Sequence, residues 1–136
     1  MIQIIKTEEL IPISLFIIIL NNKKMKTESI YNKLEYKEEK PAITVLLETD
    51  FTKEIRIVFK KEQLMKEHKT PYPIVVEIFE GAIDFGILGE IYQLKKGGLI
   101  ALEGGVPHNL KAKEDSIVRL TLAKFDDVER VKQVEN

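Results

Sequence analysis

Short hydrophobic runs recur between turn signals from Ala42 onward, and most of them alternate with polar residues. Alternation is typical of a β-strand with one buried face, because successive side chains point to opposite sides. In the range 53–60, for example, Ile55, Ile57 and Phe59 fall on one side. The pattern predicts strands in the ranges 42–49, 53–60, 73–80, 83–87, 90–94, 99–102 and 116–124, with a further strand near His108.

The segments between these strands contain turn residues and no long helical pattern. The polar range Lys61–Glu67 predicts a turn or a single helical turn. Near the end of the chain, Val128, Val131 and Val134 are three residues apart and Asp126 can cap them, which predicts one short C-terminal helix. Roughly eight or nine short strands without intervening helices favour an all-β sandwich or barrel.

Composition narrows the function classes. The 136 residues suit one domain, and the absence of cysteine excludes disulfides, thiolate metal sites and cysteine nucleophiles. The 21 basic residues are balanced by 22 acidic ones, so we expect no nucleic-acid partner. A hydrophobic content of 44% with 32% charged residues predicts a soluble protein, which we place in the cytoplasm. The two histidines limit a histidine-based metal site to two imidazoles.

Residues 1–24 differ in character from the rest of the chain. The apolar stretch Leu10–Leu20 is shorter than the roughly 20 residues that a membrane-spanning helix needs. Acidic residues precede it and no small-residue cleavage site follows it, unlike a signal peptide. We therefore expect no membrane association. The segment is interpreted as an N-terminal extension, or as a strand or helix packed on a domain of residues 25–136. Translation could start at Met1 or at Met25.

Both histidines stand in recognisable spacings with glycines. Gly81 follows His68 by thirteen residues and closes the phrase VEIFEG. Gly97 and Gly105 precede His108, which ends the phrase VPH. In these spacings the stretch from His68 to residue 111 resembles the two motifs of a small single-domain cupin.

The resemblance covers about residues 55–125. It implies a cupin-type double-stranded β-helix, that is, a jelly-roll barrel, carried by residues 25–136. It also implies a homodimer, formed through sheet edges or N-terminal strands.

The same resemblance implies a metal site, but the chain departs from the family at the ligand positions. His68 and His108 stand at two of the four usual ligand positions, whereas Thr70 replaces a histidine and Ile74 replaces a glutamate. Two imidazoles can hold one divalent transition-metal ion (Zn, Fe, Ni, Mn or Cu), although a stable site normally has three or four protein ligands. Glu103 is a candidate third ligand because it lies close to His108 in the sequence.

The parity of the residues after His68 predicts a shared cavity. In a strand, residues two apart share a face, so His68 and Thr70 fall on the same side. If this side points into the barrel, both imidazoles enter one cavity. The expected lining residues are Thr70, Ile74, Val76 and Ile78.

Three functions remain open at this point. The first is a small cupin that binds a small molecule, with or without a divalent metal, and that has no assignable reaction. The second is a metal-dependent cupin enzyme of the dioxygenase, isomerase or lyase type. The third is a non-catalytic sensor or interaction domain, which would act through a partner because the chain has no helix-turn-helix pattern.

Overall fold

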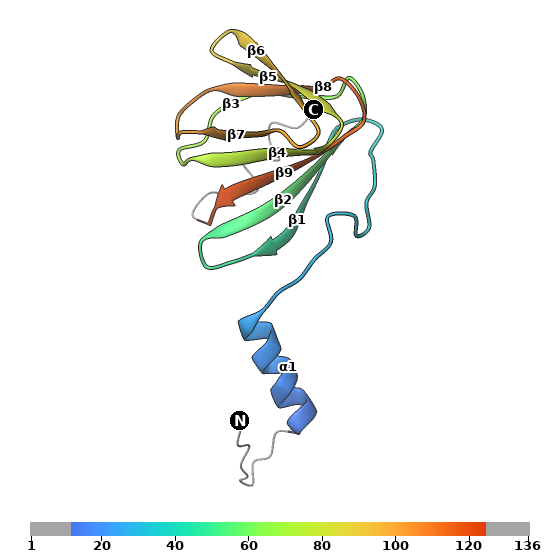
Figure 1. Cartoon of the computed structure of the whole chain (residues 1–136), viewed down its shortest axis with the longest axis vertical. Helices are drawn as coiled ribbons and strands as arrows, with labels where there is room; N and C mark the ends of the chain where they lie inside the picture. The colour runs from blue at the N-terminus through green and yellow to red at the C-terminus, as the bar shows by residue number, and fades with distance from the viewer. Residues whose placement is uncertain (1–11, 125–136) are drawn as a thin grey trace.

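The computed structural model describes residues 12–124, which form one helix and nine strands (Figure 1). The helix is α1 (Ile13–Lys24). The strands are β1 (Ala42–Glu48), β2 (Thr52–Phe59), β3 (Leu64–His68), β4 (Ile74–Glu80), β5 (Ala82–Ile87), β6 (Glu90–Lys95), β7 (Leu99–Leu102), β8 (His108–Ala112) and β9 (Ser116–Ala123). The expected C-terminal helix, Asp126–Val134, lies outside the described residues.

The strands form two antiparallel sheets. The five-stranded sheet has the order β1-β2-β9-β4-β7, and the four-stranded sheet has the order β3-β8-β5-β6. No backbone ladder joins the two sheets among residues 12–124. The expected jelly-roll barrel is therefore made of two sheets that are not closed into one: the chain crosses between the sheets at turns, and each sheet keeps its own edges. The all-β prediction is confirmed.

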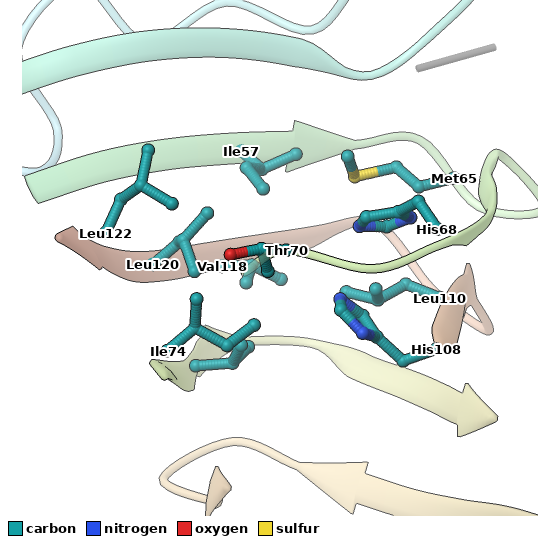
Figure 2. A pocket seen from close by; sticks show the side chains of 11 residues that line it. Ile57, Met65, His68, Thr70, Ile74, His108, Leu110, Val118, Leu120 and Leu122 are labelled. Atoms are coloured by element: carbon teal, nitrogen blue, oxygen red, sulfur yellow. The ribbon is translucent and has the colours of Figure 1, made fainter. Parts of the chain in front are cut away.

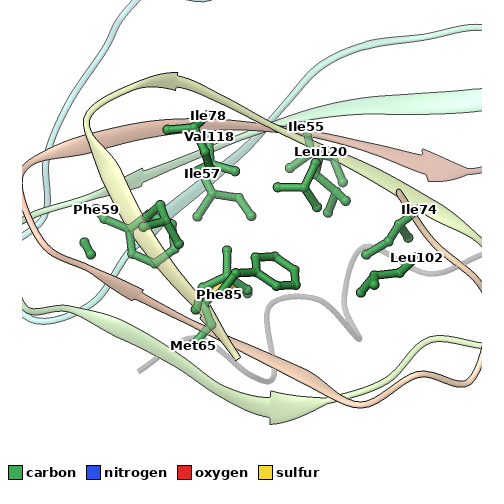
Figure 3. Packing of buried hydrophobic residues seen from close by; sticks show 14 of the residues in the cluster. Ile55, Ile57, Phe59, Met65, Ile74, Ile78, Phe85, Leu102, Val118 and Leu120 are labelled. Atoms are coloured by element: carbon green, nitrogen blue, oxygen red, sulfur yellow. The ribbon is translucent and has the colours of Figure 1, made fainter. Parts of the chain in front are cut away.

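The hydrophobic core lies between the two sheets (Figure 3). Its side chains come from alternate positions of the facing strands, as the sequence pattern predicts for half-buried strands. From β9, for example, Val118, Leu120 and Leu122 point inward, while Arg119 and Thr121 lie between them on the outer face. The larger inward side chains include Ile55, Phe59, Met65, Ile78, Ile83 and Phe85.

β2 departs from the predicted alternation because both of its faces are covered. Arg56 is 3% exposed and Val58 is 1% exposed, although both lie on the outer face. The Arg56 guanidinium donates hydrogen bonds to the carbonyl oxygens of Ile30 (2.8 Å) and Asn32 (2.9 Å). The segment before β1 therefore covers this part of the outer face.

One local prediction is wrong. Lys61–Glu67 is not only a turn, because most of β3 lies within it. β3 is an edge strand of the smaller sheet and exposes most of its charged residues, so its sequence resembles a turn. The region before β1 contains α1 and no strand among residues 12–41, which is the helix alternative expected for this segment. Figure 1 shows α1 standing apart from the sheets. None of the helices in residues 12–124 is long and apolar enough to cross a membrane.

Candidate functional site

The two histidines meet at one end of the space between the sheets (Figure 2). β3 and β8 are neighbours in the four-stranded sheet, and His68 pairs directly with His108 across them. The two imidazole rings contact each other edge to face, with ring centroids 4.3 Å apart and an interplanar angle of 61°. His108 is 2% exposed, and His68 is partly buried.

A β-bulge turns His68 toward the interior. Met65 pairs with Leu110 and His68 pairs with His108, so three steps along β3 match two steps along β8. Without the extra residue, strict alternation would place Glu67 on the inner face with Met65. The bulge instead brings Met65 and His68 to the same face, and Glu67 is exposed. This irregularity has no signal in the sequence.

Backbone carbonyls select the same tautomer in both rings. The Nδ1 atom of His68 lies 2.7 Å from the carbonyl oxygen of Lys66, and that of His108 lies 2.9 Å from the carbonyl oxygen of Val106. A carbonyl oxygen only accepts hydrogen bonds, so each Nδ1 carries the proton and donates it. In a neutral ring the lone pair then belongs to Nε2. Metal-binding histidines are commonly oriented in this way, with the other ring nitrogen on a carbonyl.

The rings border a small, mostly apolar cavity. Phe85 stacks on His108 with ring centroids 5.6 Å apart and an interplanar angle of 7°, which restricts the rotation of that imidazole. The cavity has a volume of about 20 Å³, which is room for about one water molecule. Its lining consists of Ile57, Met65, His68, Thr70, Ile74, Val76, His108, Leu110, Val118, Leu120 and Leu122.

The residues expected at the site divide into two groups. Thr70, Ile74 and Val76 line the cavity with the histidines. Ile78 is fully buried in the core but is not part of this lining. Glu103 is exposed and borders a separate outer depression beside Phe51, so the structure does not bring it to the histidines.

The loop after β3 is held by the turn before β8. The Thr70 hydroxyl accepts a hydrogen bond from the backbone N–H of Tyr72 (3.1 Å), which fixes a tight turn. The N–H of Gly105 donates to the carbonyl oxygen of Thr70 (2.7 Å). These bonds tie together the two segments that flank the histidines in the chain.

Among the described residues, the nitrogen donors of the site are the two imidazoles, and no carboxylate joins them. No group of three or more His, Cys, Asp or Glu side chains converges anywhere in residues 12–124. The two imidazoles still fit a transition-metal ion, because both rings have the tautomer that leaves Nε2 as the ligand atom and both border the same cavity.

The sequence did not predict Met65 and Phe85 as neighbours of the histidines, since neither belongs to a motif. In a regular strand, Met65 would also lie on the face opposite to that of His68.

Comparisons with known proteins bear on this arrangement of two sheets. No protein-family model matches the chain, and no curated protein matches its sequence. Solved structures do match. An RmlC-like cupin protein from Desulfovibrio desulfuricans has a TM-score of 0.67 at 19% identity, over 73% of this chain and 96% of that one. KdgF from Halomonas sp. has a TM-score of 0.65 at 16% identity, over 76% and 99%.

A conserved protein of unknown function from Streptococcus pyogenes is also similar, with a TM-score of 0.63 at 22% identity over 73% of this chain and 87% of that one. These matches establish that the chain has the cupin fold, also called the double-stranded β-helix. The resemblance seen in the sequence is thus confirmed at the level of fold. At these identities the likeness says nothing about activity, because cupin-like folds host many chemistries.

Proposed function

We propose that this cupin-fold protein binds one transition-metal ion through the Nε2 atoms of His68 and His108. The observation that carries the proposal is the paired orientation of the rings. Each Nδ1 donates to a backbone carbonyl, and the two rings contact each other at the border of one apolar cavity. Fixing the tautomer and the ring plane in advance lowers the entropy that metal binding would cost.

The volume of the cavity limits the size of any ligand that could bind to the ion. When bound, the ion would supply Lewis acidity toward a small ligand. Ligand pockets for larger molecules measure roughly 300–1,000 Å³, whereas this cavity has room for about one water molecule. The proposal therefore includes no ligand larger than a single water-sized group on the ion. The Thr70 hydroxyl is the one polar side-chain group in the described lining besides the imidazoles, and it would orient such a ligand.

The proposal assigns no reaction. The described cavity lining contains no carboxylate, lysine or tyrosine that could act as a general acid or base. Binding of an ion with a small ligand is what the present groups support. The enzymatic and the sensor alternatives would each need a residue or a partner that this lining does not provide.

Metal titration of the full chain tests the proposal. We expect about one ion per chain at saturation, and we expect His68→Ala and His108→Ala each to abolish tight binding, because one imidazole alone is a weak site. Lys66→Ala is the matched control, since this exposed side chain lies on the same strand and leaves both rings in place. Circular dichroism confirms that each variant is folded. Unchanged metal affinity in both histidine variants would refute the proposal.

A further inference from the structure

We propose that the thioether of Met65 is a third ligand of this site, and that the ion held there is cuprous copper, Cu⁺. This inference rests on the proposed function, and it replaces the divalent ion expected from the sequence with a monovalent one. It also gives a role to a buried residue that belongs to neither histidine motif.

Met65 is placed for this role by the bulge in β3. Its side chain is 1% exposed and borders the same cavity as both imidazoles. Met65 pairs with Leu110, which is one inward position along β8 from His108. Figure 2 shows the Met65 side chain running alongside the His68 ring, with its sulfur toward the interior of the cavity. The bulge thus brings a sulfur and two nitrogen donors to one wall.

The chemistry of this donor set favours a soft ion. Thioether sulfur is a poor ligand for hard cations and a good one for Cu⁺, and imidazole nitrogen suits copper as well. Cu⁺ is a d¹⁰ ion that accepts low coordination numbers, so it does not require the missing histidine and glutamate. A divalent ion would need further donors that the described lining does not contain.

The free-energy cost of burying a charge also favours the monovalent ion Cu⁺. The described lining has no carboxylate, and the cavity is bordered mainly by aliphatic side chains, so a bound cation would keep its full charge in an apolar surrounding. The cost of burying an ion scales with the square of its charge, so one positive charge costs about a quarter of what two would cost. The narrow cavity also has little room for the water molecules that complete the shell of a divalent ion.

The test compares Cu⁺ and Zn²⁺ affinities of the full chain. Cu⁺ affinity is measured without oxygen, by competition with a coloured cuprous chelator. We expect Met65→Leu to weaken Cu⁺ binding by about tenfold or more while Zn²⁺ binding changes by less than about threefold. Leucine has nearly the volume of methionine, so the core keeps its packing. Met25→Leu is the matched control, because it removes a thioether that is 65% exposed and should leave both affinities unchanged.

A spectroscopic measurement gives an independent result. Copper X-ray absorption of the Cu⁺-loaded protein should show one sulfur neighbour, which disappears in Met65→Leu and remains in Met25→Leu. If Met65→Leu fails to fold, selenomethionine labelling of the unaltered chain should instead show a selenium neighbour at copper.

The failures of the two proposals are distinguishable. Unchanged Cu⁺ affinity in Met65→Leu, with binding lost in His68→Ala and His108→Ala, overturns the thioether ligand and leaves the histidine site standing. Binding that survives both histidine substitutions overturns both proposals. An absorption spectrum with nitrogen or oxygen neighbours alone also overturns the role of Met65.

Discussion

Tyr31 shows how a single side chain joins the segment before β1 to the sheets. Its phenol donates a hydrogen bond to the carboxylate of Glu80, and its ring packs edge-on against Phe79 with centroids 5.5 Å apart. The hydrogen bond to Glu80, followed by burial and the charge of Glu80, raises the pKa of Tyr31 above its usual 10.0. The native state therefore favours the neutral phenol.

This raised pKa predicts a pH dependence of stability. The Tyr31 interaction contributes fully below pH 10.0, the usual pKa, and is lost as the pH rises through the raised native value. We expect the unaltered protein to lose stability at alkaline pH more steeply than Tyr31→Phe, in urea unfolding at neutral and alkaline pH. Glu80→Gln, which keeps the phenol and removes the charge, should lower the pKa of Tyr31 in a phenolate absorbance titration. A normal phenol pKa in the unaltered protein would contradict this account.

Gly81 is a second position where one residue decides the local structure. Its φ is +94°, and an added Cβ would lie 2.2 Å from the Ser116 hydroxyl and 2.5 Å from the Asp115 carbonyl oxygen. Ser116 is fully buried, and its hydroxyl accepts a hydrogen bond from the N–H of Ala82 (3.1 Å). The β4–β5 turn and the start of β9 therefore pack too closely for any side chain here.

We expect Gly81→Ala to lower the free energy of unfolding by about 1–3 kcal/mol more than Gly89→Ala does. Gly89 is the matched control because its φ is +83° and its added Cβ would meet nothing within 4 Å. The two variants share the cost of a positive φ, so their difference isolates the contact with Ser116. Urea unfolding measures both. Equal losses in the two variants would show that the contact relaxes freely.

At the scale of elements, most strands were predictable from their alternation, whereas the edge strand β3 was not. β2 and β9 were expected within a residue of their observed bounds, because their alternation is strong. β3 has one fully buried side chain, Met65, and most of its other residues are polar and exposed, so its sequence lacks the alternation of a strand. Its bulge depends on how the strand pairs with β8, which is information from another part of the chain. The geometry at His68 therefore could not follow from local sequence.

Arg56 governs how the segment before β1 attaches to β2. Its guanidinium is almost fully buried and donates to the carbonyl oxygens of Ile30 and Asn32. We expect Arg56→Met to destabilise the protein by about 1.5–3 kcal/mol, because the carbonyls lose a charged donor. Hydrogen exchange should show residues 26–40 losing protection ahead of the sheets.

Arg119→Met is the control for Arg56. Arg119 lies on the same outer face and pairs with Glu54 (2.6 Å) and Glu77 (3.0 Å), but it makes no described contact with the segment before β1. Its loss should lower the unfolding free energy and leave the exchange of residues 26–40 unchanged. If both variants expose that segment equally, Arg56 is not its specific attachment.

At the scale of the whole molecule, the cupin fold was predicted from the resemblance of two histidines and three glycines to the motifs of that family. In the structure, Gly81 stands at a tight turn with a positive φ, and the two histidines fall on adjacent strands of one sheet. The residues that surround the two histidines, and the size of the cavity between the sheets, were less predictable from the sequence. The small cavity and the inward thioether of Met65 arise from packing between the two sheets, and Glu103 near His108 in sequence lies on the outside.

The arrangement of the N-terminal region predicts which part of it contributes to the free energy of unfolding. α1 stands apart from the sheets in Figure 1, whereas Ile30 and Asn32 bind Arg56. We expect a chain of residues 25–136 to keep the unfolding free energy of the full chain within about 0.5 kcal/mol. A chain of residues 35–136 should lose about 1.5–3 kcal/mol, since Arg56 then loses its hydrogen bonds to these carbonyls and the segment that covers it. Urea unfolding of the three chains measures this, and equal loss in both truncations would mean that α1 stabilises the sheets after all.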